Sequence, residues 1–230
     1  MLTLDGVLIE QGDFRLSADF QITAGSRVAI LGPSGAGKST FLNALAGFVE
    51  PVQGKISWGG NDITNLAPGL RPLSVIFQDN NLFPHLSAYQ NVAIGVRPSM
   101  RMDQMETNRV RVALDRVGLG EMVERKPATL SGGQQGRVAL ARVLVRDKPL
   151  MLLDEPFSAL GPALKKEMLD LVSELVDATG ATLLMVTHDP DDAVRMADQT
   201  VFVADGVAQA PQGTDDLLAD PPAALRNYLG

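Results

Sequence analysis

The sequence contains no cysteine, so the chain has no disulfide, no thiolate nucleophile and no zinc site built on cysteine. Histidine is nearly absent too: His85 and His188 are too few for a histidine-rich metal site. No uncharged apolar stretch approaches the roughly 18 residues that a membrane-spanning helix needs. The start, Met1–Asp5, lacks the basic and apolar regions of a signal peptide. We therefore expect a protein of the reducing cytosol.

Positive charge is also scarce, because 20 lysines and arginines face 27 aspartates and glutamates, a formal net charge of −7. A nucleic-acid-binding protein normally carries a basic surface, so this balance argues against that class. What the chain does have is length and apolar content. Its 230 residues, 45% of them hydrophobic, suffice for one large domain with a buried core.

Hydrophobic periodicity divides the chain into three parts. Residues 2–22 alternate as short strands, and Val28–Leu31 is a continuous apolar run that predicts a strand covered on both faces. From about Ser87 to Asp147 the pattern is helical. After Pro149, predicted strands alternate with predicted helices, which indicates a parallel sheet with helices on its faces. The simplest architecture is an α/β core interrupted by a helical subdomain.

The strongest motif follows the run Val28–Leu31 and precedes a predicted helix over Thr40–Ala46. It matches the phosphate-binding loop G-x-x-x-x-G-K-[ST], in which glycines let the backbone wrap phosphate and the helix N-terminus adds partial positive charge. Lysine reaches the β- and γ-phosphates, and the serine hydroxyl ligates Mg²⁺. A chance glycine-rich turn is the alternative. The predicted ATP-binding residues here are Gly32, Pro33, Ser34, Gly35, Ala36, Gly37, Lys38, Ser39 and Thr40.

An apolar strand, Leu150–Leu153, ends in the two carboxylates Asp154 and Glu155. Strands of open α/β sheets deliver side chains to the edge where ligands bind. Asp154 is the predicted Mg²⁺ ligand, and Glu155 is the predicted general base for the attacking water. Acidic residues that merely end a strand are the alternative, which the phosphate loop makes the weaker one.

A second glycine-rich segment opens a predicted helix, Gln135–Arg146, with Ser131 at the N-cap position. A serine hydroxyl, glycine N–H groups and a helix N-terminus make another anion site, although an ordinary serine–glycine helix cap has the same pattern. The segment Leu130–Gln134 resembles the LSGGQ signature of ABC ATPases. That resemblance implies that a second subunit's ATP is contacted by Ser131, Gly132, Gly133 and Gln134.

Further segments fall in the order of the ABC family. Gln78 resembles the Q-loop glutamine, which implies catalytic and Mg²⁺-binding roles, and Ser158–Leu160 resembles the D-loop. His188 resembles the switch histidine at the γ-phosphate, although a lone histidine after a strand is more often structural. The resemblance covers all 230 residues. It implies a P-loop NTPase (RecA-like) core over residues 1–82 and 150–230, an antiparallel β subdomain, and an inserted α-helical subdomain over about 83–149.

The chain departs from the family pattern in three places. Gly161 stands where the D-loop usually has aspartate, and Gln135–Arg137 replaces the usual basic residue after the signature. No tyrosine or tryptophan precedes Gly32 to stack on adenine, which leaves Phe14 as the main candidate for the aromatic contact. The spacing of Phe14 to Leu16 and Phe20 equally predicts a core position.

The segment Gln78–Ser87 resembles the region of bacterial importers that receives a helix of the membrane permease. Leu82, Phe83 and Leu86 could line an apolar groove there, or pack within the helical subdomain. Taken whole, the chain is most similar to the ATP-binding subunits of bacterial thiamine importers. Importers of iron, sulfate or polyamine are the nearest alternatives, followed by a non-transport ATPase acting on nucleic acid and a nucleotide sensor without turnover.

The resemblance implies ATP and Mg²⁺ as ligands and a homodimer of ATPase subunits as the working unit. It also implies a membrane permease as direct partner, a periplasmic solute-binding protein as indirect partner, and no nucleic acid. The expected location is the cytoplasmic face of the inner membrane, as a peripheral subunit.

Overall fold

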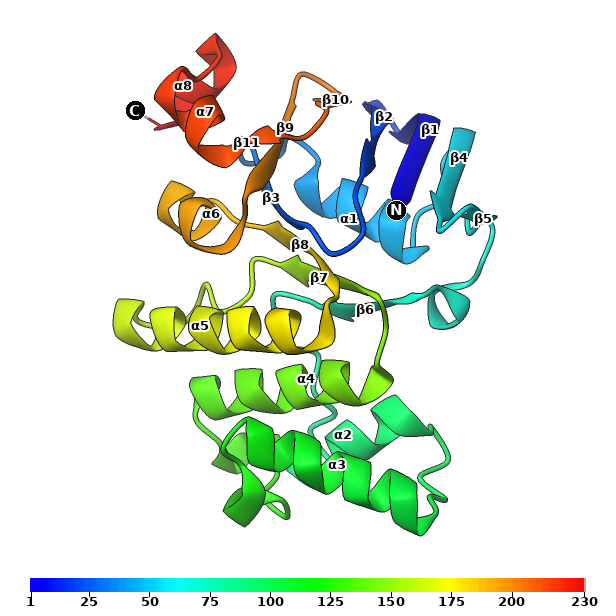
Figure 1. Cartoon of the computed structure of the whole chain (residues 1–230), viewed down its shortest axis with the longest axis vertical. Helices are drawn as coiled ribbons and strands as arrows, with labels where there is room; N and C mark the ends of the chain where they lie inside the picture. The colour runs from blue at the N-terminus through cyan, green and yellow to red at the C-terminus, as the bar shows by residue number, and fades with distance from the viewer. Residues whose placement is uncertain (230) are drawn as a thin grey trace. The chain divides into compact units, whose positions relative to one another are not determined.

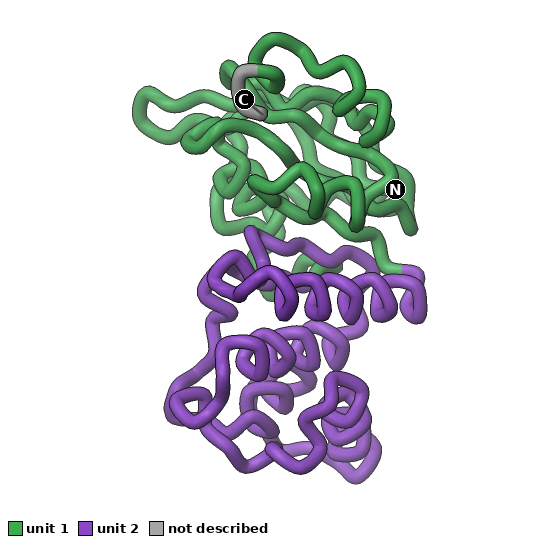
Figure 2. Tube along the Cα trace, turned by 90° about the vertical axis from the view of Figure 1, so that its left-hand side faces the viewer, with its two compact units in different colours: residues 1–73, 181–230 green, residues 74–180 purple. Residues whose placement is uncertain are grey.

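The computed structural model describes residues 1–229, which form two compact units. Unit 1 contains residues 1–73 and 181–230, and unit 2 contains residues 74–180 (Figure 2). Within the described residues, no helix combines the length and hydropathy needed to cross a membrane.

Unit 1 is built on a mixed sheet with strand order β5-β4-β1-β2-β10-β9-β3-β8, and β11 pairs with β9. On one side β1 pairs antiparallel with both β2 and β4, and on the other β3 pairs parallel with both β8 and β9. The strands are β1 (Leu2–Gln11), β2 (Phe14–Ile22), β3 (Arg27–Leu31), β4 (Gln53–Trp58), β5 (Asn61–Asp62), β8 (Thr182–Val186), β9 (Gln199–Ala204), β10 (Val207–Ala208) and β11 (Gln212–Gly213).

The parallel part of this sheet is buried because helices cover it. Val28–Leu31 of β3 have no exposed surface, as the continuous apolar run predicts. Beside β3 and β9, Leu217 and Leu225 from the C-terminal helices join one apolar cluster (Figure 1). The helices of unit 1 are α1 (Lys38–Ala46), α6 (Pro190–Met196), α7 (Thr214–Ala219), α8 (Ala223–Leu229) and the 3-10 helix η1 (Pro68–Leu70).

Unit 2 is mainly helical. Helices α2, α3 and α4 pack against one another, and α4 also packs against α5 (Figure 1). Neighbouring strands β6 and β7 complete the unit, whose boundary falls at the first residue of β6. The elements are β6 (Leu73–Ile76), α2 (Ala88–Val96), α3 (Gln104–Arg116), η2 (Gly120–Met122), η3 (Pro127–Thr129), α4 (Gly132–Arg146), β7 (Leu150–Asp154) and α5 (Pro162–Thr179).

The predicted α/β class with an antiparallel β part is confirmed by this strand arrangement. The boundaries predicted for a helical subdomain, about residues 83–149, stay a prediction. The start predicted for α1, Thr40, was two residues late, because α1 begins at Lys38. The start of α4 was also wrong: α4 begins at Gly132 and not at Gln135. Reciprocal hydrogen bonds between Ser131 and Gln134 cap the helix at this earlier point and offset the low helix propensity of the glycines.

Arg71 holds the C-terminal end of α1 in unit 1. Its side chain is 1% exposed, and its guanidinium donates to the carbonyl oxygens of Ala44 and Leu45 at 2.8 Å each. It also donates to the carbonyls of Leu66 at 2.9 Å and Thr64 at 2.6 Å. The last carbonyls of a helix lack partners within the helix. Arg71 bonds two of them, and the Ala44 carbonyl also accepts from the N–H of Gly47 at 3.2 Å.

We predict that Arg71→Met lowers the free energy of unfolding by about 3 kcal/mol or more, because four carbonyls, three of them in buried hydrogen bonds, lose a charged donor. Urea unfolding measures this change. The control is Arg15→Met, since Arg15 is 74% exposed and pairs with Glu10 on the surface. The control should cost about 1 kcal/mol or less. Equal losses in the two variants would contradict the assigned role of Arg71.

Candidate functional site

The predicted phosphate loop leaves β3 at Gly32, where the backbone has no room for a side chain. A β-carbon on Gly32 would stand 2.1 Å from the carbonyl oxygen of Val203 in the neighbouring strand β9. The loop then runs to Gly37, whose φ of +102° favours glycine. Helix α1 begins directly afterwards at Lys38. The sequence therefore folds here as a strand, a glycine-dependent loop and a helix.

The chemistry of this loop fits an anion. Lys38 is 7% exposed, and its ammonium donates to the carbonyl oxygens of Gly32 at 2.7 Å and Pro33 at 3.0 Å. The positive charge is thus held over the loop. No side chain caps the N-terminus of α1, where Gly37 is the N-cap residue. A helix N-terminus beside a cation is a ready phosphate site, so the loop fits the phosphates of ATP.

Phe14 lies against this loop. A β-carbon on Gly37 would stand 2.3 Å from Cζ of the Phe14 ring, so the ring occupies the space that glycine leaves. Phe14 is half-buried, whereas Leu16 and Phe20 are buried. The structure thus brings Phe14 and the phosphate loop together. An adenine contact by this ring stays a prediction.

His188 follows β8, the parallel neighbour of β3, so it leaves the sheet at the same edge as the phosphate loop. The N–H of Thr187 donates to the carbonyl of Ile30 at 3.2 Å. The Thr187 hydroxyl donates to Asp192 at 2.9 Å and accepts from the N–H of Asp189 at 3.1 Å. These bonds fix the backbone on both sides of the exposed His188. Sequence reasoning missed Thr187 and Asp192, which no local motif marks.

In unit 2, the buried strand β7 ends at Asp154, and the chain then turns sharply. Glu155 and Phe157 have φ values of +44° and +67°, a backbone region that side chains rarely adopt. Such strained residues cluster at functional sites. The turn continues with hydrogen bonds from Ser158 N–H to the Glu155 carbonyl at 3.4 Å and from Leu160 N–H to the Phe157 carbonyl at 2.9 Å. Asp154 and Glu155 are half-buried.

The predicted signature segment caps α4 with a reciprocal pair of bonds. Ser131 Oγ accepts from the N–H of Gln134 at 3.3 Å, and Gln134 Oε1 accepts from the N–H of Ser131 at 3.0 Å. Ser131 is exposed, so the end of α4 is open to a ligand. The cap and the predicted contact with a second subunit's ATP are compatible. The contact itself stays a prediction.

The glycines of this segment have a packing role that the sequence did not reveal. β-Carbons on Gly132, Gly133 and Gly136 would meet side-chain atoms of Leu160, Leu164 and Phe157 at 3.2, 2.8 and 3.1 Å, respectively. The first turns of α4 thus lie directly against the D-loop segment and α5. Gly133 and Gly136 are buried. Packing alone gives a reason for glycine here, in addition to the predicted N–H contacts.

Gln78 lies in a tight turn after β6, closed by a 2.9 Å hydrogen bond from the N–H of Asn80 to the carbonyl of Phe77. Its side chain is exposed. Gln78 and Asp154 of unit 2 and Ser39 of unit 1 are the predicted Mg²⁺ ligands. An amide oxygen, a carboxylate and a hydroxyl are hard oxygen donors, which fit Mg²⁺. The binding of Mg²⁺ by these three residues stays a prediction.

Two other departures from the ABC family pattern, Gly161 and Gln135, lie at the starts of helices α5 and α4. Gly161 is the N-cap residue of α5, and a β-carbon there would meet nothing within 4 Å. Packing therefore does not exclude the aspartate that the D-loop usually has. The amide of Gln135 donates to the carbonyls of Pro127 and Leu130 at 3.0 and 3.2 Å, which anchors the segment before α4.

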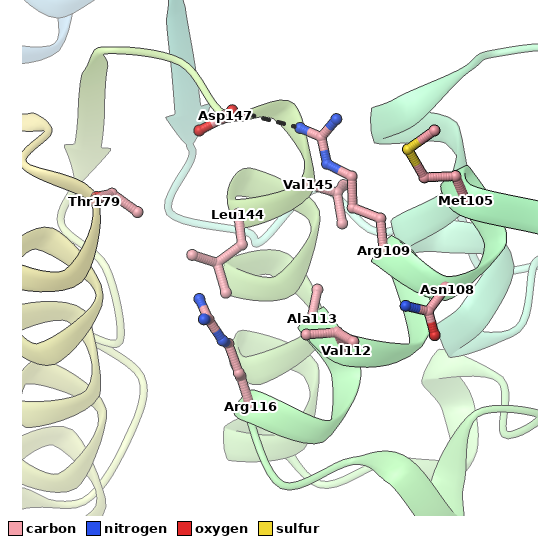
Figure 3. A pocket seen from close by; sticks show the side chains of 10 residues that line it. All are labelled: Met105, Asn108, Arg109, Val112, Ala113, Arg116, Leu144, Val145, Asp147 and Thr179. Carbon is pink, nitrogen blue, oxygen red and sulfur yellow. Dashed lines mark ion pairs between the residues drawn. The ribbon is translucent and has the colours of Figure 1, made fainter.

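A hollow of about 380 Å³ lies elsewhere in unit 2, between α3, α4 and the end of α5 (Figure 3). Val112, Ala113 and Leu144 line it, and Arg109 reaches Asp147 across 3.9 Å. None of the predicted site residues lines this hollow. It is therefore separate from the residues assigned to ATP.

Comparison with known proteins gives consistent matches. The sequence profile described as ABC transporter matches residues 16–158. A curated protein named "Thiamine import ATP-binding protein ThiQ" from Cereibacter sphaeroides is 59% identical over all of both chains. The protein of the same name from Ruegeria sp. is 54% identical, also over the full length of both chains. That from Brucella suis is 49% identical over all of this chain and 95% of its own.

Two solved structures share the fold. One is the dimeric post-hydrolysis state of the ATP-binding cassette MJ0796 bound to ADP and Pi, with a TM-score of 0.80 and 30% identity. The other is the dimeric structure of MJ0796 as a bacterial ABC transporter cassette, with a TM-score of 0.79 and 30% identity. Each comparison covers 93% of this chain and 99% of the other. The predicted P-loop NTPase fold is confirmed.

The two serine caps allow a matched test of the signature segment. Ser131→Ala and Ser87→Ala remove the same kind of capping box, from α4 and α2, and each should cost about 1 kcal/mol in the free energy of unfolding. We predict that only Ser131→Ala also lowers the ATP hydrolysis rate, by about tenfold or more, as expected for a lost hydrogen bond to a charged phosphate. Equal hydrolysis rates in the two variants would assign Ser131 a capping role alone.

Proposed function

The chain belongs to the ABC transporter family, and from this premise we propose that it is the ATP-hydrolysing subunit of a bacterial thiamine importer. The single observation that supports thiamine as the cargo is the identity of 45–59% between this chain and curated thiamine import ATP-binding proteins, over 94–100% of this chain. The two units supply residues of the types that ATP hydrolysis needs.

The proposed reaction breaks the bond between the γ-phosphorus and the oxygen that bridges it to the β-phosphate. Lys38 and the N-terminus of α1 hold the phosphates by charge and hydrogen bonds. Glu155 accepts a proton from the water that attacks phosphorus, and His188 donates a hydrogen bond to the γ-phosphate. When bound by Ser39, Gln78 and Asp154, Mg²⁺ would neutralise the charge that develops on the phosphate oxygens.

The proposed working unit is a homodimer in which Ser131, Gly132, Gly133 and Gln134 contact the ATP held by the partner subunit. The dimers of the similar cassette MJ0796 support this assembly. We further propose that the dimer binds a permease at the cytoplasmic face of the inner membrane and, through it, serves a periplasmic solute-binding protein. Phe83, 43% exposed in the segment after Gln78, supports an apolar contact with that permease.

The catalytic assignment predicts opposite behaviour for two variants. Glu155→Gln keeps the shape of the side chain but removes the basic carboxylate, so it should bind ATP and hydrolyse it at least about a hundredfold more slowly. Lys38→Ala should lose most ATP binding, because a charge-assisted phosphate contact disappears. Thermal unfolding with saturating Mg-ATP and a phosphate-release assay measure both properties.

At ATP concentrations about 100 times the dissociation constant, binding should stabilise the parent and Glu155→Gln by about 2.7 kcal/mol. Lys38→Ala should show little of this stabilisation. Hydrolysis by Glu155→Gln at the parent rate would exclude Glu155 as the base.

The cargo is tested by growth. In a strain that cannot make thiamine, deletion of the gene should raise the external thiamine concentration needed for growth and lower uptake of labelled thiamine. A plasmid copy of the parent gene should restore both, and a Glu155→Gln copy should restore neither. Uptake unchanged by the deletion would reject thiamine as cargo and leave the ATPase assignment intact.

A further inference from the structure

The turn that carries Gln78 continues into two residues with unusual backbone geometry. Asn80 and Asn81 have φ values of +55° and +45°. Asparagine tolerates this left-handed region better than other non-glycine residues, but the conformation is sparsely populated and persists only where the surroundings hold it. Two such residues in succession therefore need an external support.

Arg142, in the C-terminal half of α4, supplies that support. Its Nη1 donates to the carbonyl oxygen of Asn81 and its Nη2 to that of Asn80, each at 2.8 Å. One planar guanidinium thus bonds both carbonyls of the left-handed pair. Burial, and to a smaller extent the charge of Arg146, lowers the pKa of Arg142. Within the described residues, Arg142 pairs with no carboxylate, and its side chain donates to these two carbonyls.

The residues after this pair are held by a different helix. Asn91 of α2 is fully buried, and its amide oxygen accepts from the N–H of Phe83 at 2.8 Å. Its nitrogen donates to the carbonyls of Leu86 and Ser87 at 3.1 and 3.0 Å. Asn91 therefore anchors residues 83–87 to α2. By contrast, the carbonyls of Asn80 and Asn81 accept hydrogen bonds from the Arg142 side chain, which belongs to α4.

Helix α4 also begins at the signature segment, with Ser131 as its N-cap. We propose that Arg142 is a positioning residue, which holds the Gln78 turn to the same rigid helix that presents Ser131. This inference rests on the proposed function, in which Gln78 and Ser131 act on ATP. A shift of the Gln78 turn then moves the signature segment of the same subunit through α4, and a shift of the signature segment likewise moves the Gln78 turn.

Lysine cannot replace arginine in this role. A lysine ammonium is a single point donor on a flexible stem, whereas the guanidinium presents several N–H groups in a planar fork. Arg142→Lys therefore keeps the charge and most of the length but loses the geometry that bonds two carbonyls. The matched control is Arg137→Lys, because Arg137 also lies on α4 and bonds the Val117 carbonyl at 2.7 Å and Glu167.

The first test is a double-mutant cycle on kcat for ATP hydrolysis. If Arg142 acts through Gln78, Arg142→Lys should lower kcat by about tenfold to a hundredfold, as small misplacements of catalytic groups do. The KM for ATP should stay within about twofold. Combined with Gln78→Ala, Arg142→Lys should lower kcat no further than Gln78→Ala alone. Any effect of Arg137→Lys should instead multiply with that of Gln78→Ala.

The second test, hydrogen exchange of the protein without nucleotide, needs no enzyme activity. Amides of residues 78–82 should exchange faster in Arg142→Lys than in the parent, and Arg137→Lys should leave them unchanged. Unchanged exchange in Arg142→Lys, or multiplying effects on kcat, would overturn the proposal. If the parent hydrolyses no ATP, the proposed function fails, and the exchange measurement alone still decides whether Arg142 holds the turn.

Discussion

The carbonyl oxygen of Val203 lies 2.1 Å from the point that a β-carbon on Gly32 would occupy, and the geometry of the phosphate loop depends on this close approach. Any larger residue would push the start of the loop away from β9. The loop must then leave β3 where β8 also ends, and α1 must begin at Lys38. Arg71 holds the other end of α1 through the carbonyls of Ala44 and Leu45. The absence of a side chain at Gly32 thus determines where the phosphate loop and helix α1 lie relative to β9.

Features encoded by neighbouring residues could be predicted from the sequence. The apolar run of β3, the loop that follows it and the Ser131 cap each have a local pattern, and each is present. Arg71, Arg142 and Asn91 could not be predicted in this way. Two of them, Arg71 and Arg142, bond carbonyls far away in the sequence, and a carbonyl is the same in every residue. Only the three-dimensional arrangement reveals which carbonyls need a donor.

The start of α4 shows a second kind of limit. Glycine disfavours helix, so propensity alone places the start after Gly132 and Gly133. Tertiary packing overrides that preference, because Leu164 and Leu160 lie where side chains on these glycines would be. The same residues can serve packing inside the unit and, in the proposed dimer, N–H contacts with phosphate. A residue type required twice over gives a strong sequence motif, but the motif does not say which requirement produced it.

Helices α1 and α4 treat their N-termini differently, and the difference has a consequence for ligand binding. Ser131 caps α4 through an oxygen lone pair, so α4 has a side-chain cap without ligand, and the hydroxyl proton remains able to donate to a phosphate. At α1 the N-cap is Gly37, and no side chain provides a cap. An anion there supplies what the sequence omits. Phosphate binding should therefore stabilise the start of α1 more than that of α4, because only α1 gains a cap that it lacked.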